Sequence, residues 1–197
     1  PGVEIKIGEN DEILAKGNGI MQGYYKKPEE TAKVFTEDGW FRTGDAGKFD
    51  EAGNLYITDR IKDLMKTSNG KYIAPQQIEN LLTNNNFISQ IVLIADGKQY
   101  VSALIVPNFD FLKDFAKKNN IPHTDWEKTV QDKQIVDFYK DILKDLQKDL
   151  SDYEKVKKFT LMPAEFEIKS GEITPTLKIK RNTVLKNYAD IIEKMYQ

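Results

Sequence analysis

The chain has 197 residues, of which 40% are hydrophobic and 30% are charged, a composition typical of an ordered globular protein. Its formal net charge of −2 provides no basic field for nucleic acid, and no apolar run approaches the ~20 residues that span a bilayer. Cysteine is absent, which excludes disulfides and thiolate metal sites and fits a reducing cytoplasm.

The first 60 residues alternate short predicted strands with tight turns. Residues 3–7 alternate apolar and polar side chains, and a turn at 8–11 leads into a second strand at 12–15. A short helix is expected from Pro28 to about residue 35, because proline suits a first helical turn. This segment has few long apolar elements, so we expect part of a β subdomain that is larger than the segment itself.

Beyond residue 60 the pattern changes to alternating strands and helices. The predicted elements are a hairpin turn at 68–70, a helix opened by Pro75, an antiparallel pair at 91–95 and 101–106, and three later helices with apolar stripes centred on residues 109–115, 135–150 and 184–195. The sequence therefore predicts an α+β domain with an antiparallel sheet and packed helices, preceded by a β-rich piece. We place the boundary between residues 1–61 and 62–197.

Taken one by one, the residues of this chain give little sign of a self-contained catalytic site. His123 is the only histidine and follows Pro122 in a polar stretch, so a surface loop is the simpler interpretation. Asp45 follows Gly44 where backbone can approach a ligand, although Gly-Asp is also a common turn. Residues 59–63 lie at the change in composition, where a linker between two bodies should fall, but taken alone they favour a solvated charge run. Residues 174–181 form a basic cluster that could present a lysine to an anion.

Four segments are informative through their order. They are residues 11–17 with 21–31 (DEILAKG, MQGYYKKPEET), residues 39–45 (GWFRTGD), residues 59–66 with 70–79 (DRIKDLMK, GKYIAPQQIE) and residues 175–181 (PTLKIKR). Together they resemble the second half of the adenylate-forming enzymes, which include acyl-CoA synthetases, adenylation domains of peptide synthetases, and luciferases. Two positions depart from the family pattern, since Asp11 and Leu177 stand where glycine is usual.

The resemblance implies a role for five residues. Asp45 matches the acid that binds the ribose hydroxyls of AMP, and Arg60 matches an arginine that contacts the nucleotide. Lys62 falls on the hinge between a large and a small domain, and Gly70 on a turn that lines the path of CoA. Lys178 matches the catalytic lysine that reaches the carboxylate and α-phosphate during adenylation.

The implied chemistry converts a carboxylic acid and ATP to acyl-AMP, and then transfers the acyl group to CoA. The TLKIKR form around Leu177 resembles long-chain fatty acid–CoA ligases. Two alternatives stay open: an aryl or short-chain acyl-CoA ligase or amino-acid adenylation domain, and a noncatalytic binding module of the same fold. The first would be separated by substrate profiling, and the second by whether the reading frame continues upstream of Pro1.

The resemblance also implies what must come from elsewhere. The phosphate-binding loop, the adenine-stacking aromatic segment and the magnesium ligands are expected in an N-terminal part that acts in cis. We therefore expect this chain alone to be inactive, with fatty acid, ATP, CoA and magnesium as the ligands of the whole enzyme. The expected location is the cytoplasm, with peripheral membrane association left open.

Overall fold

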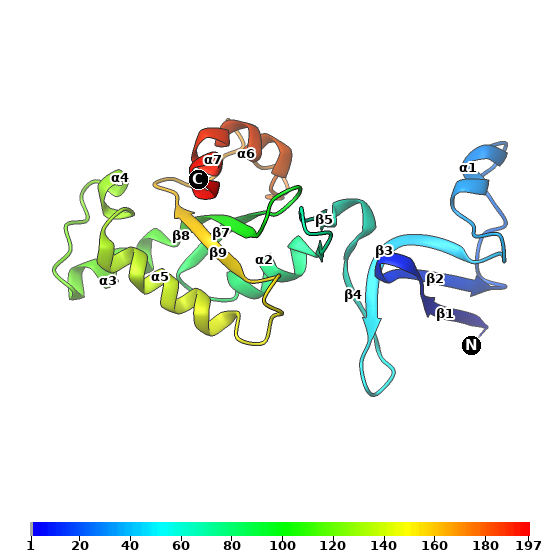
Figure 1. The fold of residues 1–197 in the computed structure, drawn as a ribbon. Coiled ribbons are helices and arrows are strands. Elements are labelled where there is room, and N and C mark those ends of the chain that lie inside the picture. The colour runs from blue at the N-terminus through cyan, green and yellow to red at the C-terminus, as the bar shows by residue number, and fades with distance from the viewer. Residues whose placement is uncertain (1) are drawn as a thin grey trace. The chain divides into compact units, whose positions relative to one another are not determined.

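The computed structural model describes residues 2–197, which fold into two compact units (Figure 1). The first unit holds the chain up to Leu64 and residues 74–77. The second holds Met65–Ile73 and Ile78–Gln197. The boundary expected between residues 61 and 62 stays a prediction, because a compact unit is not by itself a mobile domain.

The first unit is built on a four-stranded antiparallel sheet. Its strands β1 (Val3–Ile7), β2 (Glu12–Gly17), β3 (Phe41–Phe49) and β4 (Leu55–Arg60) lie side by side in chain order. The short 3-10 turn η1 (Glu9–Asp11) joins β1 to β2, and a second one, η2 (Ile61–Asp63), follows β4. Helix α1 (Pro28–Lys33) comes after β2 and before β3 in the chain. The predicted strands and short helix are confirmed, and the unit buries only a small apolar set centred on Ile13, Leu14, Ala15 and Ala46.

The second unit is built on a three-stranded sheet ordered β7-β8-β9. Strands β7 (Ile88–Ile94) and β8 (Val101–Pro107) are antiparallel, as predicted, whereas β9 (Val156–Leu161) runs parallel to β8. A separate two-stranded hairpin, β5 (Met65–Lys66) and β6 (Tyr72–Ile73), precedes helix α2 (Pro75–Thr83). The remaining helices are α3 (Phe109–Lys118), α4 (Trp126–Thr129), α5 (Lys133–Leu146), α6 (Arg181–Asn187) and α7 (Ala189–Tyr196).

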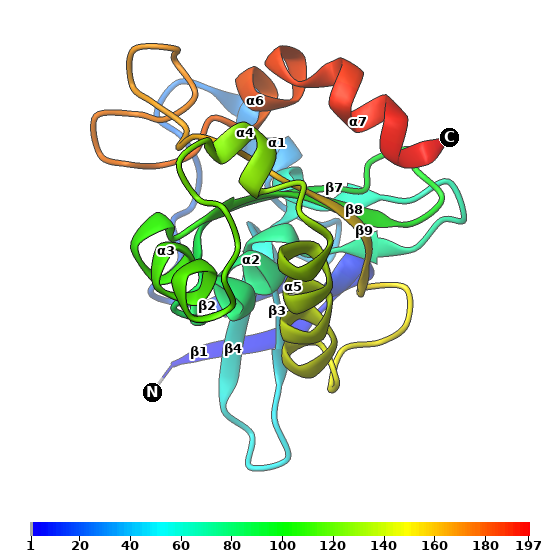
Figure 2. The ribbon, with the colours of Figure 1, turned by 90° about the vertical axis from the view of Figure 1, so that its left-hand side faces the viewer.

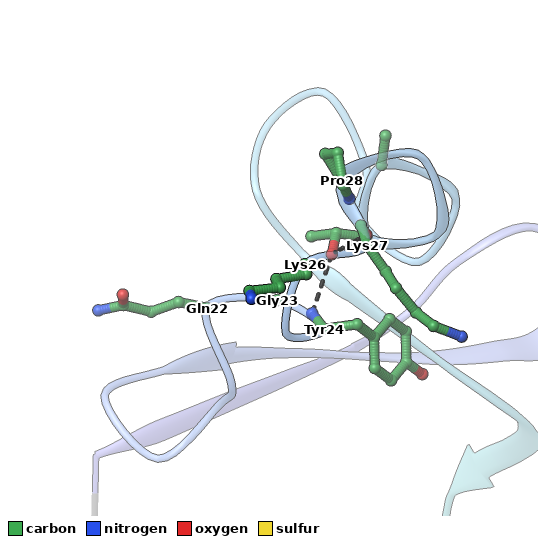
Figure 3. Close-up of a pocket in the computed structure, with 8 residues that line it drawn as sticks. Gln22, Gly23, Tyr24, Lys26, Lys27 and Pro28 are labelled. Carbon is green, nitrogen blue, oxygen red and sulfur yellow. Dashed lines mark hydrogen bonds between the residues drawn. The ribbon is translucent and has the colours of Figure 1, made fainter.

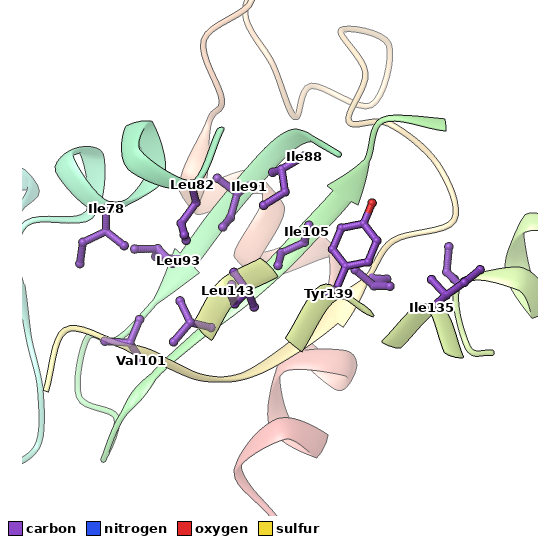
Figure 4. Close-up of a cluster of buried hydrophobic side chains, with 14 of the residues drawn as sticks. Ile78, Leu82, Ile88, Ile91, Leu93, Val101, Ile105, Ile135, Tyr139 and Leu143 are labelled. Atoms are coloured by element: carbon purple, nitrogen blue, oxygen red, sulfur yellow. The ribbon is translucent and has the colours of Figure 1, made fainter. Parts of the chain in front are cut away.

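Helices cover both faces of this sheet, so the central strand β8 is buried along its whole length (Figure 2). One face packs Ile91, Leu93 and Ile105 against residues of α2, α3 and α5, and Figure 4 shows the side chains from α2 and α5. The opposite face packs Val92, Ile94 and other strand residues against α6 and α7. Alternate strand residues therefore feed two separate apolar clusters, which is why β7 and β8 read as continuous apolar runs.

The α+β class is confirmed, and three details differ from the sequence prediction. Strand β9 was not predicted, because Lys157 and Lys158 interrupt its apolar pattern. The helix expected to run to Leu150 ends at Leu146, and the last helix is broken at Tyr188, whose backbone leaves the helical region between α6 and α7. Among the helices of residues 2–197, none has both the length and the apolarity needed to cross a membrane.

Candidate functional site

Asp45 and Arg60 lie opposite each other on paired strands of the first unit. Asp45 is on β3 and Arg60 ends β4, and the two residues are register partners. The Arg60 Nε lies 3.8 Å from the Asp45 Oδ1, with side chains 64% and 35% exposed. An ion pair this long and this exposed is weak, because water screens both charges. Little energy is therefore needed to separate the two side chains, so that a ligand's hydroxyl or phosphate groups could bind them instead.

The residues just before Asp45 hold its backbone. The Thr43 hydroxyl donates to the Ile13 carbonyl at 2.8 Å and accepts from the Asp45 N–H at 3.1 Å. Gly44 has φ +74°, a conformation that L side chains rarely adopt. The buried Glu12 carboxylate accepts from the Gly44 N–H at 3.3 Å and from Arg42 at 3.0 Å. Arg42, Thr43 and Gly44 of the RTGD segment thus each have a structural role, while the Asp45 side chain is left half-exposed.

Asp59 is a buried carboxylate that the sequence analysis treated as part of a charge run. Asp59 is only 4% exposed. Its carboxylate accepts hydrogen bonds from the backbone N–H of Arg60 at 2.7 Å and from the backbone N–H of Gln76 at 2.9 Å. Gln76 belongs to the first turn of α2, whose N–H groups lack helical partners. The 17-residue separation of the partners leaves no local signal, so this role could not be read from the sequence.

Lys62 and Gly70 both lie in turns, although a turn was predicted only for Gly70. Lys62 is exposed on the 3-10 turn η2, in the first unit. Gly70 closes the β5–β6 hairpin in the second unit, donating from its N–H to the Thr67 carbonyl at 2.9 Å. That hairpin is held by the β7–β8 turn, since Ser68 N–H donates to the Lys98 carbonyl at 2.9 Å. The hairpin turn at 68–70 is therefore confirmed, while the roles of Lys62 and Gly70 stay predictions.

Lys178 lies on a tight hairpin of the second unit, formed by residues 174–178 and here named the Lys178 hairpin. An antiparallel bridge pairs Ile173 with Ile179 at its base. Thr174 closes it, donating from its N–H to the Lys178 carbonyl at 2.8 Å and accepting from the Lys178 N–H on its hydroxyl at 3.0 Å. Lys178 is exposed and has no carboxylate within ion-pair distance among the described residues. Its ammonium group is thus presented to solvent from an ordered turn.

The two residues that stand where the family has glycine both keep a left-handed backbone. Asp11 has φ +60° in the turn between β1 and β2, and Leu177 has φ +60° in the Lys178 hairpin. Aspartate tolerates this region because its short polar side chain bonds locally, whereas leucine does not. The chain path of both segments is therefore the one that a glycine would favour, despite the changed residue.

Glu172 anchors one side of the base of the Lys178 hairpin. Its buried carboxylate accepts from Ser170 Oγ at 2.7 Å, from the Glu167 N–H at 3.2 Å and from Asn187 Nδ2 at 3.0 Å. Its own carbonyl accepts from the Lys180 N–H at 2.7 Å. Burial raises the pKa of Glu172, but the hydrogen bonds from these donors outweigh burial and hold the pKa below its ordinary value.

Tyr188 belongs to the same side-chain group. Burial, with the neighbouring Glu172 carboxylate second, raises the pKa of Tyr188 to about 12, so the phenol keeps its proton near neutral pH. The sequence analysis singled out neither Glu172 nor Tyr188 as a supporting residue. Their positions on either side of Lys178 in the sequence gave no sign of a shared contact.

A surface pocket of about 560 Å³ lies beside α1 in the first unit (Figure 3). Its lining comes from residues 22–24, 26–28 and 31–32, and includes no residue predicted to act on a ligand. The Thr31 hydroxyl accepts from the Tyr24 N–H at 2.9 Å and donates to the Lys27 carbonyl at 2.8 Å. A Cβ on Gly23 would lie 2.7 Å from the Thr31 methyl group, so only glycine fits there. Local packing thus explains Gly23 and Thr31 of the GYYKKPEET segment.

Residues 2–197 contain no group of three or more histidine, cysteine, aspartate or glutamate side chains able to hold a metal ion. Because Mg²⁺ is often held by one or two carboxylates together with substrate phosphates, the expectation that its ligands lie in an N-terminal part stays a prediction. His123 is half-buried, and its Nδ1 lies 3.0 Å from the Ile121 carbonyl oxygen, which is a local loop contact.

The model of the AMP-binding enzyme C-terminal domain matches residues 62–197. The chain belongs to this family of adenylate-forming enzymes. It is 33% identical over its whole length to the long-chain-fatty-acid–CoA ligase FadD15 of Mycobacterium tuberculosis, and 36% identical over 191 residues to the human long-chain-fatty-acid–CoA ligase 1. It covers 33% and 27% of these two proteins, so the chain spans about a third of the length of the curated relatives it matches.

Solved structures with the same fold include adenylation domains. The chain superposes over its whole length on the adenylation domain of a carboxylate reductase from Mycobacterium chelonae, with a TM-score of 0.71, 25% identity and 31% of that chain covered. The adenylation domain of a carboxylic acid reductase from Segniliparus rugosus, in complex with AMP and a co-purified carboxylic acid, gives a TM-score of 0.70 at 25% identity, with 32% of that chain covered. The resemblance inferred from the four sequence segments is thereby confirmed.

Proposed function

We propose that this chain is the C-terminal part of a long-chain fatty acid–CoA ligase that forms acyl-AMP from a fatty acid and ATP and then acyl-CoA. Support for the ligase class comes from family membership, and support for the long-chain substrate comes from the names of the relatives. The chain covers 33% and 27% of those relatives, and we expect the acyl-binding part of the enzyme in the part that it does not cover.

In the proposed adenylation step, Asp45 binds the nucleotide and Lys178 stabilises the transition state. The Asp45 carboxylate accepts hydrogen bonds from both ribose hydroxyls, and Arg60 turns from Asp45 toward the nucleotide. The fatty-acid carboxylate then attacks the α-phosphorus, forming the acyl–phosphate bond as the bond to pyrophosphate breaks. Negative charge builds between two anionic groups, and the Lys178 ammonium offsets it.

In the proposed second step, the small domain turns about Lys62 and carries Lys178 away. The CoA thiolate attacks the acyl carbon along a path lined by the Gly70 turn, and AMP leaves with the bonding electron pair. One site can thus serve two reactions, because the cation needed for the first is removed before the second. Magnesium, when bound, would neutralise the phosphates, and we expect its protein ligands in the N-terminal part of the enzyme.

The observation that carries the proposal is the exposed, unpaired Lys178 on a closed hairpin. A lysine that merely solubilised the surface would need no such support, whereas here two hydrogen bonds to Thr174 and a left-handed Leu177 fix the backbone that bears it. A fixed backbone with a free ammonium group suits delivery of a charge to a transition state.

The test is acyl-CoA formation by the complete polypeptide that contains this chain, with ATP, CoA and palmitate, acetate or benzoate offered in parallel. We expect palmitate to be activated and the two other acids to be poor substrates. Preference for acetate or benzoate would replace the long-chain assignment with the short-chain or aryl alternative. Absence of activity on all three acids would favour the noncatalytic module.

A further inference from the structure

Glu79 and Arg181 form a two-pronged ion pair in the second unit. Arg181 Nη1 lies 2.7 Å from Glu79 Oε1, and Nη2 lies 2.8 Å from Oε2. The Arg181 side chain is 27% exposed and the Glu79 side chain is 17% exposed, so this pair is far better shielded from water than the pair of Asp45 and Arg60. Parallel N–H···O bonds between a guanidinium and a carboxylate fix direction as well as distance.

The same two side chains also bind the backbone of Leu93. The Leu93 N–H donates to Glu79 Oε1 at 2.8 Å, and the Leu93 carbonyl accepts from Arg181 Nη1 at 2.8 Å. Because β7 is an edge strand, its outward N–H and carbonyl groups have no neighbouring strand to bind. The ion pair takes the place of that strand, with the carboxylate as acceptor and the guanidinium as donor.

This arrangement connects the Lys178 hairpin to the sheet. Arg181 is the first residue of α6 and follows Lys178 by three residues. On the preceding arm, Glu172 holds the Lys180 N–H. Within the hairpin itself, the hydrogen bonds are local ones around Thr174. The place of Lys178 relative to the sheet therefore depends on what anchors the hairpin at its base. Ile173 and Ile179 join the apolar cluster that includes Val92 and Ile94 of β7, and Arg181 is the polar anchor that reaches β7.

We propose that Glu79 and Arg181 are positioning residues for Lys178. The proposal rests on the function proposed above, in which Lys178 acts in adenylation. The pair touches neither substrate nor nucleotide in this role. It sets where the hairpin presents the ammonium group, and misplacing a catalytic group by about 1 Å can cost on the order of 100-fold in rate. Thioester formation does not use Lys178, so it does not depend on the pair.

The decisive experiment measures the two half-reactions separately in the complete polypeptide. Palmitate-dependent exchange of pyrophosphate into ATP reports adenylation, and transfer from supplied palmitoyl-AMP to CoA reports the second step. For Glu79→Gln we expect exchange to fall about tenfold to 100-fold while transfer stays within about twofold. Arg181→Lys keeps the positive charge but cannot form the two parallel hydrogen bonds to Glu79. We therefore expect a smaller fall in the exchange rate than in Glu79→Gln, and no change in the transfer rate. The matched control is Asp137→Asn, which removes two exposed ion pairs of α5 and should change neither rate.

A second measurement reads the position of the hairpin without any activity. Trypsin cleavage after Lys178 and Lys180, followed by mass spectrometry, should become several-fold faster in Glu79→Gln than in Asp137→Asn. Equal loss of both half-reactions, or unchanged exchange and unchanged cleavage, would overturn the proposal. Lys178→Ala separates the two hypotheses. If this variant leaves exchange intact, the proposed catalytic role of Lys178 is wrong. Faster cleavage in Glu79→Gln would then still show that Glu79 and Arg181 hold the hairpin in place.

Discussion

Leu177 is the clearest case of local strain in the chain. Its side chain is 73% exposed, and its φ of +60° lies in the region that costs an L residue about 1–2 kcal/mol. The turn around it is otherwise favourable, because Pro175 holds the second position and the Leu177 N–H donates to the Thr174 carbonyl at 2.8 Å. Leucine is thus retained at a conformational cost that no buried contact offsets.

Replacing Leu177 by glycine should stabilise the protein. Relief of the left-handed strain exceeds the backbone entropy that glycine loses on folding, which leaves a net gain of about 0.5 kcal/mol. Leu177→Ala is the matched control, since alanine keeps the strain and removes the same exposed side chain. Urea unfolding of both variants measures the difference. A glycine variant no more stable than the alanine variant would contradict the strained backbone.

The segments that carry the family resemblance act as structural elements as well as candidate site residues. In the RTGD segment, Thr43 and Gly44 shape the backbone, while Asp45 is left exposed beside Arg60. At the last segment, Thr174 just before it closes the hairpin, Arg181 anchors the hairpin, and Lys178 is left free. The residue that is open to a ligand in each segment is supported by neighbours that are not.

The support given by Glu172 should depend on pH. Its pKa lies below the ordinary 4.5 in the folded protein, so its stabilising contribution is present above the unfolded pKa and is lost as the pH falls through the folded value. Glu172→Gln should cost about 1–3 kcal/mol near neutral pH, because three donors converge on the carboxylate and an amide nitrogen accepts no hydrogen bond. Below pH 4.5 the variant and the parent should become more alike.

Chemical denaturation at both pH values measures this difference. Asp137→Asn serves as the comparison, since Asp137 lies on the exposed face of α5 and its loss leaves the hairpin base intact. A stability difference between Glu172→Gln and the parent that does not shrink in acid would mean that the charge of Glu172 is not what stabilises the hairpin base.

Elements with strong local signals were predictable, and contacts between distant segments were not. The apolar runs of β7 and β8 and the turn at Gly70 were predicted because each is encoded within a few residues. Strand β9 was missed because its pairing with β8 depends on a partner more than 50 residues away. For the same reason, the contact of Asp59 with Gln76 and the contact of Glu79 with Arg181 could not be predicted. The two residues are 17 positions apart in the first contact and 102 apart in the second.

At the scale of the whole molecule, the candidate site residues are divided between two compact units. Asp45, Arg60 and Lys62 lie in the first unit, and Gly70 and Lys178 lie in the second. This division is what an enzyme needs if one unit is to hold the nucleotide and the other is to bring a cation to it and take it away. We expect the phosphate-binding loop and the magnesium ligands in an N-terminal part, and we therefore predict that the chain alone does not form acyl-CoA.

The most direct test of this account is palmitate-dependent pyrophosphate exchange by the complete polypeptide carrying Lys178→Ala. The matched control is Lys180→Ala, which removes an equally exposed lysine two residues away. The account predicts that exchange falls by about 100-fold or more in Lys178→Ala, as for loss of one transition-state donor, and stays near the parent rate in Lys180→Ala. Equal rates in the two variants would contradict the assignment of Lys178 and, with it, the proposed adenylation mechanism.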